Sequence, residues 1–213
     1  MKRSIYSLVL ADDVIKAVDR EASRLGTSRS NLINQILAAE LSCVTPEMRM
    51  HDIFDSLTEH IDRSFQIQQQ RSASLMTMKT ALEYKYRPTI SYRVELARSP
   101  DIFIGTLRVS VRTMNEKLMD MFRNFFMYWS DMESEQLSRL KYGEELSDLT
   151  TVTFVRKLLN TGLDDQNTAC AIGSYLDTLN RSLQTYFANP SCLMDYSPWL
   201  EEQYKSMLEK YTI

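Results

Sequence analysis

The sequence contains few of the residues that interrupt regular structure or bind metals. Its 213 residues include five glycines, five prolines, three cysteines and two histidines. So few glycines and prolines favour long regular elements over a loop-rich architecture. The cysteines, Cys43, Cys170 and Cys192, are odd in number and too far apart for a disulfide framework or a metal knuckle. We therefore expect reduced thiols, no metal site and no cofactor.

Apolar runs long enough to cross a membrane are also missing, since a spanning helix needs about 20 such residues. The N-terminus starts basic and turns apolar, as a signal peptide does. Its apolar part stops at the pair Asp12-Asp13, without a small-residue cleavage site. These features predict a cytoplasmic protein with no membrane partner.

Neither sign of charge is in large excess. The net charge is -3, with 44% hydrophobic and 25% charged residues, as in ordinary globular proteins. Residues 1–45 hold six basic and five acidic side chains, which gives this segment a charge of +1. The charge distribution thus permits a nucleic-acid partner at the N-terminus without requiring one.

Motifs that carry catalysis are absent from the sequence. It has no Walker loop, dinucleotide fingerprint, nucleophile elbow or HExxH motif. His51 and His60 are nine residues apart, a spacing that does not place them on one helix face. Asp164-Asp165 precedes a helical pattern, where carboxylates commonly cap a helix. We expect a protein that is not an enzyme.

The first ten residues alternate as an extended strand does. Tyr6, Leu8 and Leu10 fall on one face, and the other carries Ile5, Ser7 and Val9. The pair Asp12-Asp13 follows and is expected to cap a helix over residues 14–25. That helix has an apolar stripe made of Val14, Val18, Ala22 and Leu25.

A short turn then separates this helix from a second one. Gly26 is expected to end the first helix, because glycine adopts the left-handed conformation at little cost. The run Thr27-Ser28-Arg29-Ser30 offers several caps for the second helix. The apolar face of that helix consists of Leu32, Ile33, Ile36, Leu37 and Leu41.

One strand and two short helices cannot bury much surface in about 45 residues, and the strand leaves an open edge. Both problems disappear if two copies pair their strands into an antiparallel ribbon. A two-stranded ribbon fits the major groove of B-DNA, where base edges can be distinguished.

This order of elements resembles the ribbon-helix-helix family of the Arc, MetJ and CopG type. The resemblance is carried by the strand from Ser4 to Leu10, the two helices and the turn Leu25-Gly26-x-Ser28-Arg29-Ser30, and it covers residues 2–43. It implies a homodimer that binds double-stranded DNA.

The resemblance also assigns roles to residues. Base contacts would come from Arg3, Ile5, Ser7 and Val9, and phosphate contacts from Thr27, Ser28, Arg29 and Ser30. The dimer core would consist of Tyr6, Leu8, Leu10, Val14, Val18, Leu32, Ile33 and Ile36. Ile5 and Val9 depart from the family, whose members usually have polar or basic side chains on the groove face.

The remaining four fifths of the chain is outside this resemblance. Apolar spacings of three and four predict a helical connector over residues 46–82. Alternation over Ile90–Leu96 and Leu107–Val111 predicts an antiparallel hairpin. Its polar side would carry Arg93, Arg108 and Arg112, either as a solvated face or as a site for phosphate, an acidic ligand or a partner. Further helices are expected over residues 115–141, 147–160 and 164–187, and from Ser197-Pro198 onward.

The sequence thus predicts a mainly α (α+β) protein in three parts. These are a ribbon-helix-helix unit (1–45), a helical connector (46–82) and a mostly helical domain with one β-hairpin (83–213). The leading functional hypothesis is a sequence-specific, bacterial-type transcriptional repressor, with an effector or protein partner at the C-terminal domain. One alternative is an accessory protein of a plasmid or mobile element, in replication control, partition or a relaxosome. Another is an antitoxin-like interaction module.

Overall fold

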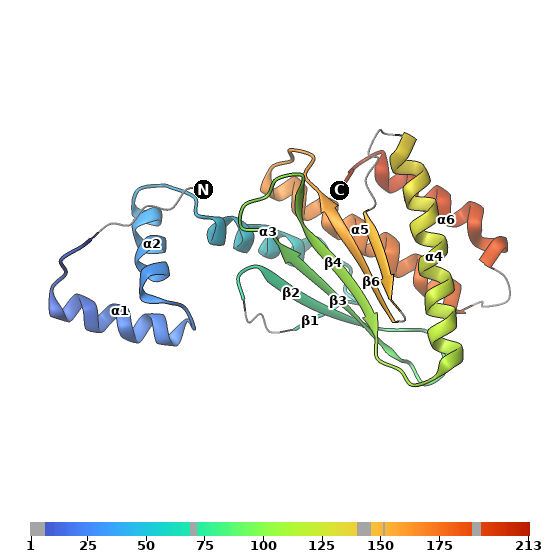
Figure 1. Ribbon diagram of the computed structural model, residues 1–213, viewed down its shortest axis with the longest axis horizontal. Helices are drawn as coiled ribbons and strands as arrows, with labels where there is room; N and C mark the ends of the chain where they lie inside the picture. The colour runs from blue at the N-terminus through green and yellow to red at the C-terminus, as the bar shows by residue number, and fades with distance from the viewer. Residues whose placement is uncertain (1–6, 69–71, 140–145, 151, 189–192) are drawn as a thin grey trace. The chain divides into compact units, whose positions relative to one another are not determined.

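The computed structural model describes residues 7–68, 72–139, 146–150, 152–188 and 193–213. The chain divides into two compact units, Met1–Arg49 and Met50–Ile213 (Figure 1). The described residues form six helices and a six-stranded antiparallel sheet, so the protein is of the mixed α+β class. The sheet is much larger than the single hairpin expected.

The first unit contains α1 (Asp12–Arg24) and α2 (Arg29–Glu40), where the sequence predicts its first two helices. The residues Ser7 to Leu10 before α1 form no strand within the part of the chain that is described. The predicted cap is wrong: Ala11 occupies the N-cap position, with no side-chain cap hydrogen bond, and Asp12 and Asp13 lie in the first turn. There their charges still favour the positive end of the helix dipole.

The second unit is built on the sheet, with strand order β1-β2-β3-β4-β6-β5. The strands are β1 (Gln66–Ile67), β2 (Leu75–Ala81), β3 (Thr89–Leu96), β4 (Phe103–Val111), β5 (Ser147–Thr150) and β6 (Thr153–Leu159). The helices are α3 (Pro46–His60), which starts before this unit, α4 (Glu116–Arg139), α5 (Asp165–Ala188) and α6 (Leu193–Leu208). Every strand pair is antiparallel.

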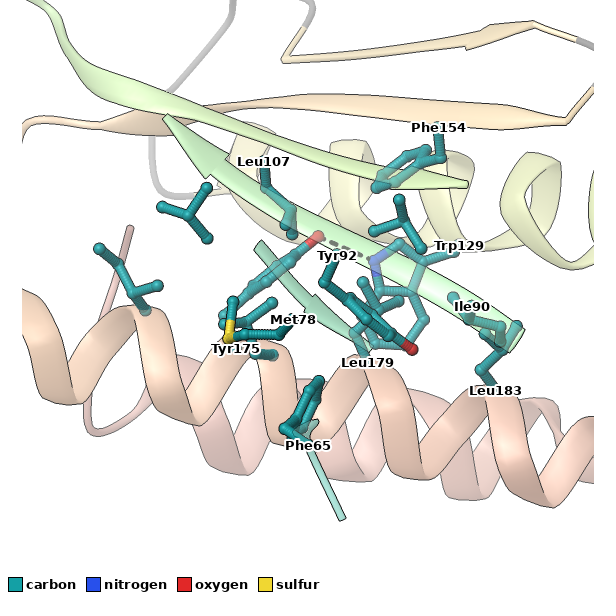
Figure 2. Close-up of a cluster of buried hydrophobic side chains, with 14 of the residues drawn as sticks. Phe65, Met78, Ile90, Tyr92, Leu107, Trp129, Phe154, Tyr175, Leu179 and Leu183 are labelled. Atoms are coloured by element: carbon teal, nitrogen blue, oxygen red, sulfur yellow. Dashed lines mark hydrogen bonds between the residues drawn. The ribbon is translucent and has the colours of Figure 1, made fainter. Parts of the chain in front are cut away.

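The helices of this unit pack on one face of the sheet. Along β3 the side chains alternate, with Ile90, Tyr92 and Val94 buried and Arg93 and Glu95 exposed. In Figure 2 the buried side chains of the strands meet Leu179 and Leu183 of α5. One hydrophobic core joins the inward face of the sheet to α3, α4, α5 and α6. Within the second unit, none of the described helices packs on the opposite face of the central strands β2, β3 and β4, which lie in front of α5 in Figure 1.

The predicted hairpin is confirmed as β3 and β4. Arg93 pairs directly with Arg108 across the two strands, on the outward face. Near the start of β4 the register shifts at Gly105, where the backbone of Glu95 approaches closely. A Cβ at Gly105 would lie 2.2 Å from the carbonyl oxygen of Glu95, so this position requires glycine.

Two segments predicted as helical are strands. The range 46–82 is helical only as far as His60, and Leu75–Ala81 forms β2. Its buried positions are Met76, Met78 and Thr80, and the polar Thr80 hides the period of two. The range 147–160 holds β5 (Ser147–Thr150) and β6 (Thr153–Leu159). In β6 Arg156 lies at a buried position between Phe154 and Leu158 and again masks the alternation. Pairing with neighbouring strands decided both segments against their local helical tendency.

The other helices lie close to their predicted positions. Helix α4 and helix α5 match the ranges 115–141 and 164–187 within two residues at each end. Asp164 caps α5 by accepting a hydrogen bond of 2.7 Å from the N–H of Asn167, which lowers the pKa of its carboxyl. Helix α6 begins at Leu193, earlier than expected, so that Pro198 lies inside it.

Candidate nucleic-acid interface

The turn between α1 and α2 has a defined hydrogen-bonded geometry. Gly26 adopts the left-handed conformation, with φ of 62°, as its sequence position predicts. The N–H of Thr27 donates to the carbonyl of Ala22 at 2.9 Å, and that of Gly26 donates to Ser23 at 3.3 Å. These two bonds form a Schellman motif, which satisfies the last carbonyls of α1 and fixes where α2 starts.

Two hydroxyls lie at the start of α2. Ser28 is the N-cap and accepts a hydrogen bond of 3.2 Å from the N–H of Asn31. Thr27 accepts one of 2.9 Å from the side-chain amide of Asn31. Each hydroxyl keeps its own proton to donate, because a hydroxyl is both donor and acceptor. The start of α2 therefore presents O–H donors at the positive end of a helix, an arrangement that suits a phosphate.

Arg29, the first residue of α2, pairs with a carboxylate. Its guanidinium contacts both oxygens of Asp19 from α1, with Nη2 at 2.7 Å from Oδ2 and a second contact between Nε and Oδ1. The pair holds the two helices together across the turn. Arg29 can reach a phosphate only by sharing its guanidinium with Asp19. Ser30, the fourth residue assigned to phosphate, is exposed in the first turn of α2.

The residues assigned to the groove are only partly described. Arg3 and Ile5 lie outside the described residues, as does Tyr6, which was assigned to the dimer core. Ser7 is exposed and Val9 is fully exposed.

The residues assigned to the dimer core differ widely in burial. Leu32 is buried within the unit, whereas Leu10, Val18 and Ile33 are half-buried. Among the described residues of this unit, nine large apolar side chains are exposed: Leu8, Val9, Val14, Ile15, Leu25, Ile36, Leu37, Leu41 and Val44. The rest of the described chain exposes five: Ile67, Tyr86, Ile102, Met114 and Met127. The apolar surface is therefore concentrated in the smaller unit.

Sequence reasoning missed a polar cluster in the core of the second unit. The Arg156 Nε donates to Glu133 Oε1 at 2.9 Å, and both side chains are almost fully buried. Tyr204 donates to the same oxygen at 2.8 Å and Tyr175 donates to the other at 3.3 Å. Trp129 donates to Tyr175, the bond drawn in Figure 2. The signal for this cluster is Arg156, a charged side chain at an inward strand position. It can be recognised only once residues 153–159 are assigned as a strand.

The charges of this cluster are fixed by their mutual contacts. Burial alone would lower the pKa of Arg156, but the attraction of the Glu133 carboxylate outweighs it, so that pKa is raised. Burial, reinforced by the same carboxylate, raises the pKa of Tyr175 and of Tyr204. The cluster is thus an ion pair with two neutral phenols, closed off from solvent, and it is suited to holding α4, α5, α6 and β6 together.

Two shallow pockets lie elsewhere. One of about 630 Å³ is lined by Glu83, Tyr84, Lys85, Arg87, Phe187 and Ala188. The other, of about 520 Å³, lies on α1 between Asp13, Lys16, Asp19 and Arg20. No group of three or more His, Cys, Asp or Glu side chains that could hold a metal occurs within the described ranges. None of the helices described there is long and apolar enough to cross a membrane.

We compared the chain with known protein families, curated proteins and solved structures. No family model, no curated protein and no solved structure matches the chain.

Proposed function

We propose that this protein binds double-stranded DNA as a homodimer through its first unit and acts as a transcriptional regulator, with repression as the leading role. In the dimer the extended segment before α1 pairs with that of a second copy to form a ribbon-helix-helix fold. The ribbon enters the major groove, and Ser7 and Val9, with Arg3 and Ile5, face the bases.

The observation that carries this proposal is the exposed apolar surface of the first unit. Val14 of α1 and Ile36 of α2 are among the nine exposed side chains, and both belong to the expected dimer core. Fully burying a side chain of this size contributes about 1.5–3 kcal/mol. A concentrated apolar surface of this kind marks an interaction site, and a second copy would cover it.

The turn before α2 supports DNA as the ligand. Thr27 and Ser28 offer hydroxyl protons at the N-terminus of α2, where the helix dipole favours an anion. Contacts of this kind position a protein on the DNA backbone without reading sequence. Base selection then depends on the ribbon, where Val9 would contact a thymine methyl group and Ser7 would form hydrogen bonds.

The folded second unit favours a regulator or a plasmid accessory protein over an antitoxin. Antitoxin tails that neutralise a toxin are commonly short and disordered when free. Here Met50–Ile213 forms a sheet whose inward face packs on helices in a large hydrophobic core. Selection of bound sequences from genomic DNA separates the two remaining roles, since operator sites indicate repression and a plasmid origin or transfer site indicates the accessory role.

The dimer is tested by a matched pair of substitutions. Ile36 and Ile102 are exposed to nearly the same extent, 53% and 55%, and Ile102 lies in the second unit. Sedimentation should show a dimer at micromolar concentration for the wild type and for Ile102→Glu, and a monomer for Ile36→Glu. DNA affinity should fall only in Ile36→Glu. A monomeric wild type that still protects DNA would overturn the proposal.

A further inference from the structure

The central sheet presents a polar, basic face on which none of the described helices of the second unit packs. The inward pair Tyr92 and Val109 is fully buried, and the next pair along the two strands, Arg93 and Arg108, points outward and is exposed. The outward positions of the strands carry four basic side chains, Lys79, Arg93, Arg108 and Lys157. They carry two acidic ones, Glu95 and Asp148. The chain as a whole has a net charge of -3, so its overall composition does not explain this excess of positive charge.

Two like charges meet at the centre of this face. Arg93 and Arg108 are direct cross-strand partners in the register of β3 and β4. Like charges in such positions repel each other and destabilise a sheet. Neither guanidinium forms an ion pair with a carboxylate in the part of the chain that the structure describes. Each presents five N–H donors, and an anion between them would remove the repulsion and accept from both.

Hydroxyls surround the two arginines. Thr77 is the partner of Arg93 on β2. Ser91 and Ser110, partners of each other, precede and follow the arginines along β3 and β4, and Thr106 lies on the other side of Arg108. Arginine with serine and threonine is the side-chain set that contacts DNA phosphates. The same central positions carry no aromatic ring on which an unpaired base could stack.

We propose that this face, centred on Arg93 and Arg108, binds backbone phosphates of duplex DNA and so gives each chain a second DNA contact. The choice of DNA as the ligand rests on the proposed function. The new element is a role for the second unit in binding it. A specific protein partner fits less well, because the cores of protein interfaces are depleted in charge and enriched in aromatic residues. Interfaces with DNA are polar and positively charged. This face is polar too, and its basic side chains outnumber its acidic ones.

The test uses the full chain and one duplex of random sequence, about 40 base pairs long, with affinity measured over a range of KCl concentrations. The variant is Arg93→Ser with Arg108→Ser. The control is Arg123→Ser with Arg139→Ser, which removes the same charge from α4, where each arginine pairs with an acidic neighbour on the helix surface. A third variant, with both Arg93 and Arg108 changed to Lys, keeps the charge.

Each lost phosphate contact lowers the slope of log affinity against log salt by about 0.9 on B-DNA. In the Arg93/Arg108 serine variant the magnitude of this slope should therefore decrease by about 2. In the lysine variant and in the control the slope should remain close to that of the wild type. A serine variant that matches the control overturns the inference. So does a serine variant that loses affinity for polyglutamate but not for the duplex, because that result makes the partner an acidic protein. Thermal unfolding checks that the serine variant remains folded.

A variant in the proposed ribbon distinguishes failure of this inference from failure of the proposed function. Val9→Glu puts a negative charge on the fully exposed groove position. If the ribbon binds DNA, Val9→Glu weakens the duplex complex by about ten-fold or more, and the loss adds to that of the Arg93/Arg108 variant. If Val9→Glu changes nothing while the Arg93/Arg108 variant abolishes binding, the sheet face is the DNA site and the ribbon proposal fails. If the wild type binds no duplex, both fail.

Discussion

Arg156 and Glu133 form an ion pair at 2.9 Å in the core of the second unit, with side-chain exposures of 0% and 2%. The guanidinium also lies over the ring of Tyr175, 4.5 Å from its centre, and Nη1 donates to the carbonyl of Lys157. A pair this deeply buried is costly to desolvate, and it is maintained by the hydrogen bonds around it. The pair joins β6, which the sequence did not predict as a strand, to α4, which the sequence predicted as a helix.

The first prediction concerns the removal of one partner from this pair. Arg156→Met leaves the Glu133 carboxylate buried without its counter-charge and should lower the free energy of unfolding by about 3–5 kcal/mol. Glu133→Gln should have a comparable effect, because it leaves Arg156 unpaired. The double variant should lose less than the sum of the two, as urea denaturation would show. Additive losses would contradict a direct coupling.

The second prediction concerns pH and Asp177 on α5. Burial raises the pKa of Asp177 to about 6, and repulsion by Asp62 adds to the effect. Because the pKa is higher in the folded than in the unfolded protein, the native state favours the protonated form. This contribution to stability is complete below the unfolded pKa near 4 and is lost as the pH rises through about 6.

Asp177→Asn should remove this dependence. Its amide oxygen can still accept the hydrogen bond from the N–H of Asp62, which is 3.2 Å long. Relative to the wild type, the free energy of unfolding of the variant should increase by roughly 1–3 kcal/mol between pH 4 and pH 8. The measurement is urea unfolding across that range, with the exposed Asp131→Asn as control. Parallel pH curves for Asp177→Asn and the wild type would refute the prediction.

The third prediction concerns a buried amide between the sheet and α5. The Asn180 Oδ1 accepts hydrogen bonds from Tyr92, at 2.9 Å, and from Thr80, at 3.1 Å. Asn180→Leu leaves both hydroxyls buried without their acceptor and should destabilise the protein by about 2–4 kcal/mol. Tyr92→Phe removes one donor, and Asn180 Oδ1 still accepts from Thr80. This variant should therefore lose only about 0.5–1.5 kcal/mol of unfolding free energy. Chemical denaturation of the two variants should give losses in that order.

The fourth prediction concerns two left-handed residues that end α1 and α2. Gly26 has φ of 62° and Ser42 has φ of 52°. The N–H of Cys43 donates to Ala38 at 2.8 Å, so the second helix ends in the same motif as the first. Gly26→Ala should destabilise the first unit by about 1 kcal/mol, and Ser42→Gly should stabilise it by a similar amount. Hydrogen exchange of the amides of α1 and α2 would measure both effects without requiring global unfolding.

Several features of the fold were readable because they depend on nearby residues. The helices α1 and α2, the left-handed Gly26 and the cap at Asp164 each follow from a few consecutive side chains and their backbone preferences. The β3–β4 hairpin was readable for the same reason, since the alternation over Ile90–Leu96 and Leu107–Val111 is uninterrupted and a Ser-Pro-Asp turn lies between the strands. The first unit owes its proposed DNA site to such local patterns.

The tertiary structure alone decided the extent of the sheet and the contents of its core. Strands β2 and β6 carry Thr80 and Arg156 at inward positions, and these polar residues break the pattern that sequence reasoning depends on. They are tolerated because Asn180 and Glu133, each distant along the chain, supply their hydrogen-bond partners. The face that brings Arg93 against Arg108 likewise exists only through strand register. The helices, turns and caps follow from the sequence itself, because they depend on neighbouring residues. The sheet and its buried polar pairs were decided by the tertiary structure, because their partners are distant along the chain.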